Sequence, residues 1–388
     1  MVEPTTTERR ARRWALGLTV AYLLVTGVKV ALARAALRES ASLREQSPPG
    51  SSQAPPVTVL VPVRSGDPQL ASVLTEQAEG LAGARVLLCV DEDDPNAVRV
   101  AEQVAASALE TVEVRRFAPP PTDQNPKVAK LALAAAQVPD GLIALLDDDT
   151  VLPPGALARA VAALADADLV TGVPVYREQG EVWSRLLAAF VNGSSLLTYL
   201  PAARLAAPVT VNGMFVVTTT EALARAGGLD EIAHEVCDDY ALARAYRRAG
   251  LRIAQTTVVH PLVTTVPGPV AYASQMRRWM LFATQVLHRD PSPVLLGLVV
   301  VPSVLPSAML ATAVRAGGAA PAAAVAAVGT KALATRWLRG QAGGPTGGAG
   351  VGLEIVSDLL LPVHLATALL GPRTVTWRGR RVRVRAPR

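Results

Sequence analysis

The 388-residue chain is poor in cysteine, histidine, aromatic residues and charge. Its two cysteines, Cys89 and Cys237, form no CxxC pair, so we expect no disulfide framework or zinc site, and a reducing compartment is compatible. The four histidines are scattered without metal-ligand spacing. Aromatic residues make up 4% of the chain and are not interleaved with basic ones, so no nucleic-acid partner is expected.

Hydrophobic residues, by contrast, make up 50% of the chain against 18% charged residues, so part of the apolar surface is expected to face lipid. Residues 14–36 are apolar over the length of a membrane span, and Lys29 lies near one end, where it can snorkel to the interface. The run is long for a signal-peptide core, which favours an uncleaved anchor. Residues 293–313 and 355–370 are further apolar stretches, and 319–334 is a marginal span or an interfacial helix.

The net charge of +6 is concentrated at the flanks of these apolar stretches, as expected for clusters that meet anionic lipid. Between the flanks the composition divides the chain into an anchor (1–37), a polar Pro/Ser-rich linker (38–56), a central domain (57–290), apolar helices (291–372) and a basic tail (373–388). In the central domain, buried-type strands at 57–63, 85–90 and 142–146 alternate with helical-period stretches at 69–81, 97–109 and 127–136. This alternation predicts an α/β domain with a parallel sheet.

Acidic residues follow two of these strands, where parallel sheets bind ligands. Asp91 follows the second strand, and its carboxylate can accept a hydrogen bond from a nucleotide base or ribose. Asp147, Asp148 and Asp149 follow the third, and two carboxylates at i and i+2 can bind a divalent cation that bridges phosphates. The run also fits the nucleophile motif of haloacid-dehalogenase-type phosphatases, although two strand–helix units precede it and no Lys loop follows.

Two later motifs also carry chemistry. Asp238 and Asp239 begin a helix, where carboxylates cap free N–H groups, and their clustering favours a raised pKa suited to a general base. Gln275, Arg278 and Trp279 lie within about one helical turn, so they can share a face. Arginine pairs with diphosphate and tryptophan can form the floor of an acceptor pocket, while an amphipathic interfacial helix explains the same residues.

The order of these motifs resembles one enzyme family. Asp91 is followed by Asn125-Pro126-Lys127, the DDD run, Asn212-Gly213-Met214, Ala226–Leu229, Asp238-Asp239-Tyr240 and QxxRW, and the chain closes on a WRGR-type tail. This order resembles the ceramide-glucosyltransferase-like branch of the family-2-type inverting glycosyltransferases, including bacterial glycolipid and hopanoid-biosynthesis relatives. The resemblance runs from about Val57 to Trp279 and resumes at the C-terminus.

The resemblance implies a GT-A fold over residues 57–290, with N- and C-terminal transmembrane helices. It implies that a UDP-sugar donor is bound by Asp91 or Asp93, Lys127, Asp147 and Arg278, and that Asp147 and Asp149 hold Mg²⁺ or Mn²⁺. It implies that Asp239, with Asp238 beside it, is the base, and that Gln275 and Trp279 border diphosphate and acceptor. Eukaryotic ceramide enzymes carry a sparser second motif, so metal usage can differ.

The expected reaction is an inverting transfer to a lipid hydroxyl of ceramide, diacylglycerol or hopanoid type. The expected location is the inner cell membrane, with several crossings and the catalytic domain facing the cytoplasm. The Arg cluster before residue 14 favours a cytoplasmic N-terminus, which conflicts with a single crossing before a cytoplasmic domain. A processive polysaccharide synthase, with the same motif set but more spans, and a catalytically silent membrane scaffold are the alternatives.

Overall fold

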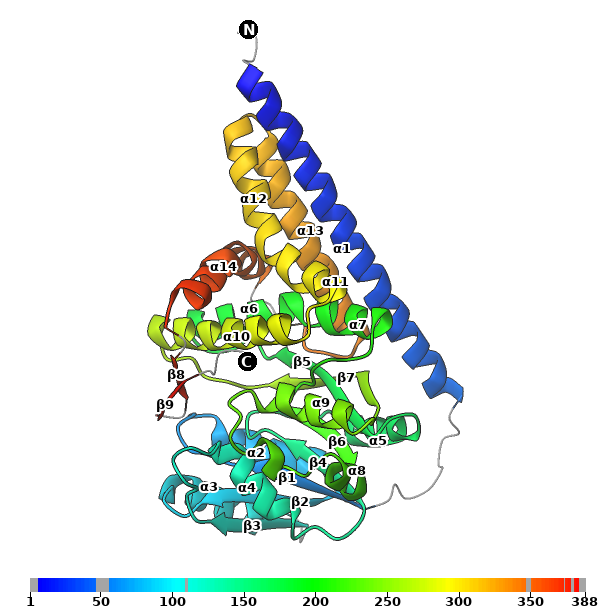
Figure 1. The fold of residues 1–388 in the computed structure, drawn as a ribbon, viewed down its shortest axis with the longest axis vertical. Coiled ribbons are helices and arrows are strands. Elements are labelled where there is room, and N and C mark those ends of the chain that lie inside the picture. Colours follow the sequence, from blue (N-terminus) through cyan, green and yellow to red (C-terminus); the bar gives the residue numbers. More distant parts are fainter. Residues whose placement is uncertain are drawn as a thin grey trace. The chain divides into compact units, whose positions relative to one another are not determined.

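A computed structural model describes residues 6–46, 56–108, 111–346, 350–372, 374–377 and 380–383. The chain forms two compact units, each built from separate stretches of the sequence. Unit 1 comprises Met1–Glu39, Glu178–Ala206 and Val266–Arg388, and unit 2 comprises Ser40–Arg177 and Ala207–Thr265 (Figure 1). The stretch Glu178–Ala206 lies within the range predicted for the central domain, and the structure groups it with unit 1.

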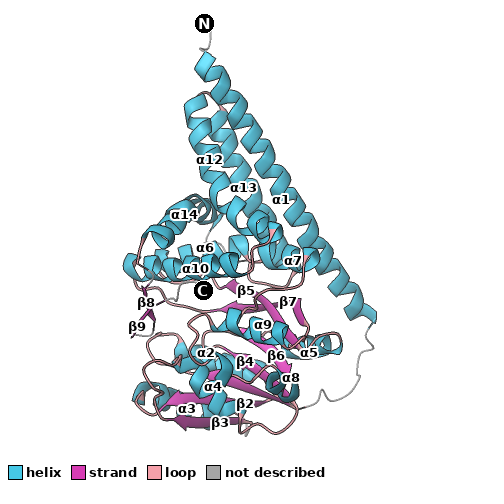
Figure 2. Cartoon of the chain, in the orientation of Figure 1, coloured by secondary structure: helices cyan, strands magenta, loops and turns pink. Residues whose placement is uncertain are grey.

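Unit 2 is built on a seven-stranded sheet with the strand order β3-β2-β1-β4-β6-β5-β7 (Figure 2). Neighbouring strands are parallel, except that β6 runs antiparallel to both β4 and β5. The three strands predicted from the sequence are β1, β2 and β4, which lie side by side. The strands are β1 (Val57–Pro62), β2 (Arg85–Asp91), β3 (Val112–Phe117), β4 (Leu142–Leu146), β5 (Leu169–Tyr176), β6 (Phe215–Thr219) and β7 (Ile253–Leu262).

Helices cover both faces of this sheet. Successive side chains of a strand point to opposite faces, so Val59 and Val61 enter one apolar core and Leu60 enters the other. Because both faces are covered, the central strands are apolar throughout, and polar side chains collect at their ends. The helices of unit 2 are α2 (Leu70–Gly80), α3 (Pro95–Ser107), α4 (Pro126–Ala135), α5 (Ala156–Ala162), η1 (Ala163–Ala165), α8 (Thr220–Arg225), η2 (Asp230–Ile232) and α9 (Asp238–Arg248).

Unit 1 is helical apart from a short hairpin. Its elements are α1 (Thr6–Gln46, which unit 2 shares from Ser40), α6 (Val182–Ser194), α7 (Leu196–Leu205), α10 (Pro269–Arg289), α11 (Pro293–Leu295), η3 (Leu296–Val300), α12 (Val301–Ala316), α13 (Ala320–Gln341), α14 (Gly350–Leu370), β8 (Thr374–Trp377) and β9 (Arg380–Arg383). The chain turns back between α12 and α13, and both pack against the N-terminal half of α1 through an apolar cluster that includes Tyr22, Met309 and Val328.

Four segments within the described ranges are long and apolar enough to cross a membrane: Arg9–Ser42, Val182–Leu205, Pro293–Ala316 and Gly350–Leu370. Three of them contain the apolar stretches that stand out in the sequence. The fourth, Val182–Leu205, is 67% buried inside the protein over its apolar window, so much of its apolar surface contacts other helices. The helix α13, which contains residues 320–334 of the predicted stretch 319–334, is not among the four.

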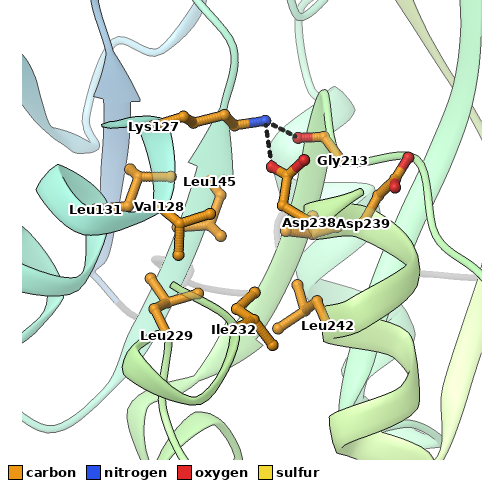
Figure 3. Close-up of a pocket in the computed structure, with 11 residues that line it drawn as sticks. Lys127, Val128, Leu131, Leu145, Gly213, Leu229, Ile232, Asp238, Asp239 and Leu242 are labelled. Carbon is orange, nitrogen blue, oxygen red and sulfur yellow. Dashed lines mark hydrogen bonds and ion pairs between the residues drawn. The ribbon is translucent and has the colours of Figure 1, made fainter. Parts of the chain in front are cut away.

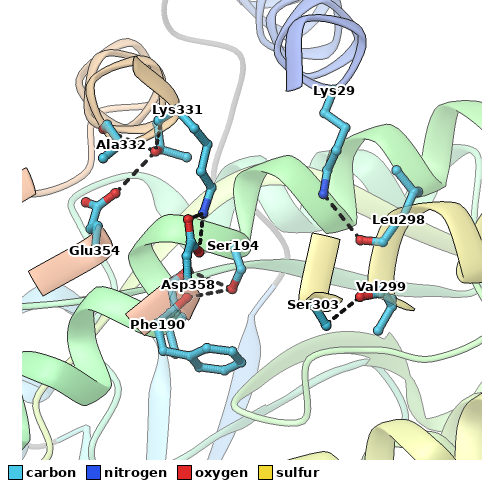
Figure 4. Close-up of polar contacts among 12 residues, drawn as sticks. Lys29, Phe190, Ser194, Leu298, Val299, Ser303, Lys331, Ala332, Glu354 and Asp358 are labelled. Atoms are coloured by element: carbon cyan, nitrogen blue, oxygen red, sulfur yellow. Dashed lines mark hydrogen bonds and ion pairs between the residues drawn. The ribbon is translucent and has the colours of Figure 1, made fainter. Parts of the chain in front are cut away.

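A network of charged side chains connects α13 and α14 within unit 1. Lys331 Nζ lies 2.7 and 2.8 Å from the two carboxylate oxygens of Asp358 (Figure 4). Arg339 donates to Glu354 at 3.0 Å, and its other terminal nitrogen lies 3.5 Å from Glu178. The Arg339 side chain is 1% exposed, so its charge depends on these carboxylates for stabilisation.

Lys29 on α1 lies within electrostatic reach of this network. Its side chain turns into the helix packing instead of snorkelling as the sequence suggested, and the residue is only 7% exposed. Its Nζ donates to the Leu298 carbonyl at 3.2 Å (Figure 4). Pro302, four residues further on, has no N–H for that carbonyl, and Leu296–Val300 is π-helical. The ammonium thus satisfies a backbone acceptor that would otherwise lack its regular helical donor.

Candidate active site

The candidate site lies in unit 2, at the carboxyl ends of β1, β2 and β4. Asp91 is the last residue of β2, Asp147 follows β4 directly, and Arg64 follows β1. Because these strands are parallel neighbours, their ends meet at the same edge of the sheet, as the sequence predicted. The backbone N–H of Arg64 donates to Asp148 at 2.7 Å, which ties the loop after β1 to the acidic run.

Lys127 connects several of the motifs. Asn125 caps α4 by accepting from the N–H groups of Lys127 and Val128, which fixes the start of the helix. From there Lys127 Nζ reaches Asp147 at 2.7 Å and Asp238 at 3.2 Å. It also donates to the Gly213 carbonyl at 3.1 Å (Figure 3). One ammonium therefore brings together the NPK, DDD, NGM and DDY segments, which are far apart in the sequence.

A small cavity of about 20 Å³ lies beside these groups. Figure 3 shows Lys127, Asp238 and Asp239 toward one end of it and apolar side chains such as Leu229 and Ile232 toward the other. The cavity therefore has a polar end and an apolar wall.

The three carboxylates of the acidic run point to different partners. Asp147 pairs with Lys127, and Asp148 accepts from the backbone of Arg64. Asp149 accepts from the hydroxyls of Thr150 at 3.1 Å and Thr264 at 2.8 Å. Burial, reinforced by the negative charges of Asp147 and Asp148, raises the pKa of Asp149 to about 7. Among the described residues, this part of the site therefore places three adjacent carboxylates beside one lysine, an excess of negative charge.

The donor set fits a divalent cation as an incomplete site. Within the described ranges no group of three or more Asp, Glu, His and Cys side chains is arranged to hold a metal ion. Mg²⁺ is usually bound by one or two carboxylates, with substrate phosphates and water completing the shell. Asp147 and Asp149 supply that number of carboxylates, and the unbalanced charge favours a cation beside them.

Two supporting residues were not singled out from the sequence. Gln77 is 1% exposed on α2 and donates to the carbonyls of Asp147 at 2.7 Å and Thr150 at 2.6 Å, which fixes the backbone of the acidic run. Its sequence signal is a polar residue within the apolar face formed by Val73, Leu74 and their neighbours. Asp94 accepts from both the N–H and the hydroxyl of Ser65 and also caps α3.

Asp239 begins α9 beside Asp238 and is held at one oxygen. Its Oδ1 accepts from the Tyr240 N–H at 2.7 Å and from the Cys237 thiol at 3.0 Å. Burial and the neighbouring Asp238 charge raise its pKa, while these hydrogen bonds and Lys127 oppose the rise. A side chain on Gly213 would put its Cβ 2.9 Å from that of Asp239, so glycine is required for this approach.

The two candidate acids after β2 differ in their surroundings. Asp91 has a side chain 3% exposed and pairs with Lys130 on α4 at 2.6 Å. Asp93 is exposed, and the structure does not bring it together with the other site residues. Of the two predicted contacts for the nucleotide, only Asp91 lies in the buried part of the site.

The QxxRW residues belong to α10 in unit 1, where all three are half-buried. The Trp279 ring stacks on Phe190 of α6, with ring centroids 5.8 Å apart. The neighbouring Arg277 donates to the carbonyls of Thr374 at 3.1 Å and Thr367 at 3.4 Å. Within unit 1, β8, where the WRGR-type tail begins, therefore lies against the QxxRW helix.

Comparison with solved structures supports the fold. A mannosyltransferase from Pyrobaculum calidifontis, in complex with GDP-Man and Mn²⁺, matches with a TM-score of 0.56 and 19% identity. The match covers 92% of this chain and 99% of that one. A mycobacterial protein matches with a TM-score of 0.38 and 19% identity, over 62% of this chain and 76% of its own. At these identities the first match shows the fold alone, and the second is too distant to add to it.

The family comparison goes further than the fold. The profile described as "Glycosyl transferase family 21" matches residues 19–388, nearly the whole chain. The predicted GT-A-type α/β fold and the predicted glycosyltransferase activity are therefore confirmed, and the phosphatase interpretation of the acidic run is set aside. The chain belongs to glycosyl transferase family 21.

Proposed function

We propose that this glycosyltransferase moves a sugar from a UDP-sugar to the hydroxyl of a membrane lipid, with inversion at the anomeric carbon. The observation that carries the proposal is the Asp239 carboxylate, held at one oxygen and partly exposed at the rim of the pocket that contains Lys127. A base fixed in this way, beside groups that suit a diphosphate, is what an acceptor hydroxyl needs for activation.

The donor is proposed to lie along the carboxyl edge of the sheet. Asp91 contacts the base, and Lys127 pairs with the diphosphate. Asp147 and Asp149 would hold a divalent ion, Mg²⁺ or Mn²⁺, which when bound offsets negative charge on the diphosphate. The neighbour from Pyrobaculum calidifontis, which carries a nucleotide-sugar and Mn²⁺, supports a donor and a cation of these classes.

The chemistry then follows from the placement of the carboxylates. Asp239 accepts the proton of the acceptor hydroxyl, whose oxygen forms a bond to the anomeric carbon as the bond to the UDP oxygen breaks. Asp238, paired with Lys127, keeps that ammonium between the base and the donor. Holding both substrates at this edge removes much of the entropic barrier of a two-substrate reaction.

The acceptor is proposed to be a lipid of ceramide, diacylglycerol or hopanoid type. Four segments of the described chain can cross a membrane, and Gln275 and Trp279, proposed at the acceptor, lie on the helix that leads into one of them. We place the protein in the inner cell membrane, with several crossings and the pocket facing the cytoplasm. A processive synthase is the alternative, and the length of the product distinguishes it: one added sugar supports the proposal, and a polymer contradicts it.

The decisive experiment is Asp239→Asn in purified protein with UDP-sugars and a lipid extract. Transfer should fall by about 10²–10⁴-fold, because the amide cannot accept the proton, while UDP binding stays close to the wild-type value. Asp230→Asn is the matched control, since Asp230 is an exposed carboxylate of the same unit. Normal turnover in Asp239→Asn would refute the base assignment.

A further inference from the structure

A second lysine of α4 reaches the candidate site. Lys130 lies three residues after Lys127, so both side chains leave the same face of the helix. Lys130 Nζ contacts Asp91 Oδ2 at 2.6 Å and the Val63 carbonyl at 3.2 Å. The side chains of Lys130 and Asp91 are 1% and 3% exposed, so this is a fully buried ion pair at the end of β2.

The two oxygens of Asp91 are not equivalent. Oδ2 receives the Lys130 ammonium, and the Arg64 guanidinium lies 3.9 Å from the same oxygen. Oδ1 is buried, and among the residues that the structure describes it has no hydrogen-bond partner. A buried carboxylate oxygen without a donor is unfavourable, because it has lost water without gaining a replacement. Its position at the ligand-binding edge of the sheet indicates that a ligand supplies the donor.

We propose that Lys130 is a specificity-determining residue that restricts Asp91 to one open acceptor and thereby selects uracil as the base of the donor. The inference rests on the proposed function and goes beyond it by assigning Lys130 a role in the choice of the donor's base. Uracil presents a single N–H between two carbonyls, which matches one carboxylate oxygen next to a cation. The Arg64 guanidinium lies 3.9 Å from the oxygen that Lys130 already contacts, so Oδ1 stays the acceptor without a partner among the described residues.

Other bases fit this arrangement less well. Guanine offers two adjacent N–H donors, which suit a carboxylate with both oxygens open, and Lys130 occupies one of them. Cytosine and adenine present a ring nitrogen acceptor where uracil has its N–H. That nitrogen carries no hydrogen to donate to the carboxylate oxygen, and the two lone pairs would repel. The alternative explanation is that Lys130 only neutralises Asp91 in the core, in which case it would affect stability without affecting the choice of base.

The first test uses the wild-type protein and so involves no folding risk. Dissociation constants for UDP, 3-methyl-UDP, GDP and CDP are measured by titration calorimetry in detergent with Mn²⁺ present. We expect UDP to bind about tenfold more tightly than each of the others, because only UDP gives Oδ1 a single donor. Equal binding of UDP and 3-methyl-UDP would overturn the assignment of Oδ1. Failure of every nucleotide to bind would overturn the proposed function and this inference with it.

The second test isolates Lys130. In Lys130→Met the Oδ2 oxygen of Asp91 loses its close ammonium and can accept a second donor, so UDP binding should weaken and the GDP-to-UDP ratio of dissociation constants should fall by about tenfold. A ratio within one variant does not depend on the folded fraction, and Lys130→Gln replaces Lys130→Met if the latter does not fold. Arg85→Met is the control. Arg85 lies at the opposite end of β2 from Asp91 and pairs with Glu113, so its loss should leave the ratio of dissociation constants unchanged. An unchanged ratio in the Lys130 variant, with UDP still bound, would overturn this inference alone.

Discussion

The buried charges of the two units are balanced in different ways. In unit 2, Lys127 pairs with Asp147 and Asp238, and three further carboxylates adjoin these two in the chain: Asp148, Asp149 and Asp239. The network of unit 1 contains three cations, Lys29, Lys331 and Arg339, and three carboxylates, Glu178, Glu354 and Asp358. Clustered, half-buried carboxylates repel one another, and protons or a bound cation relieve that repulsion. The unbalanced cluster therefore indicates a ligand site, and the balanced one a structural connection between helices.

The largest effect on stability is expected when one carboxylate is removed from the charged network of unit 1. Asp358→Leu leaves the Lys331 ammonium buried without its carboxylate, which should lower the free energy of unfolding by about 3–5 kcal/mol. The double variant Lys331→Met/Asp358→Leu removes both charges and should regain most of that loss. Unfolding of the detergent-solubilised protein, followed by circular dichroism, measures both variants. If the double variant is as unstable as the single one, the pair is not the source of the effect.

A second prediction concerns the unbalanced cluster of unit 2. Removing divalent cations with a chelator should lower the rate of transfer by about a hundredfold, and added Mn²⁺ should restore it. Asp149→Ala should raise the Mn²⁺ concentration needed for donor binding. Asp230→Asn is its control, because Asp230 is an exposed carboxylate of the same unit outside the cluster. Full activity in the chelator would contradict the metal-ligand role of this cluster.

The smallest expected effect is on the pH dependence of the reaction. Burial and Asp238 raise the pKa of Asp239, and the base must be deprotonated to act. The acid limb of kcat/KM should therefore lie above about 3.9, the ordinary value for an aspartate. Cys237→Ala removes a hydrogen bond that favours the charged form, so it should move this limb to still higher pH. An acid limb that stays in place in this variant would show that the thiol does not influence the base.

Local sequence was sufficient for β1, β2 and β4, but not for the interior strands β5 and β6. The apolar runs that became β1, β2 and β4 are buried on both faces, and such strands need no partner to be recognised. By contrast, β3 is an edge strand with a charged sequence, VEVRRF, and had no such signal. The antiparallel direction of β6 depends on its pairing with β4, whose residues precede it by about seventy positions, and periodicity within a strand carries no information about direction.

The site was foreseen in part. The order of Asp91, the DDD run, DDY and QxxRW indicated the glycosyltransferase family, which the family profile confirms. The individual roles assigned to these residues stay predictions. The contacts of Lys127 with Asp147 and Asp238, and of Lys130 with Asp91, join residues far apart in the sequence. Gln77 gave a weak signal, as a polar residue in an apolar helix face, because only the fold reveals which carbonyls it reaches.

The sequence by itself determined the family and the fold class, because these follow from residue types at strand ends and from the order of motifs along the chain. The tertiary structure decided how the charges are distributed: Lys127 serves the acidic cluster, Lys130 occupies one oxygen of Asp91, and Lys29 turns to the carbonyl of Leu298. Three lysines that look alike in the sequence have different partners, because the energy of a buried charge depends on its neighbours in space.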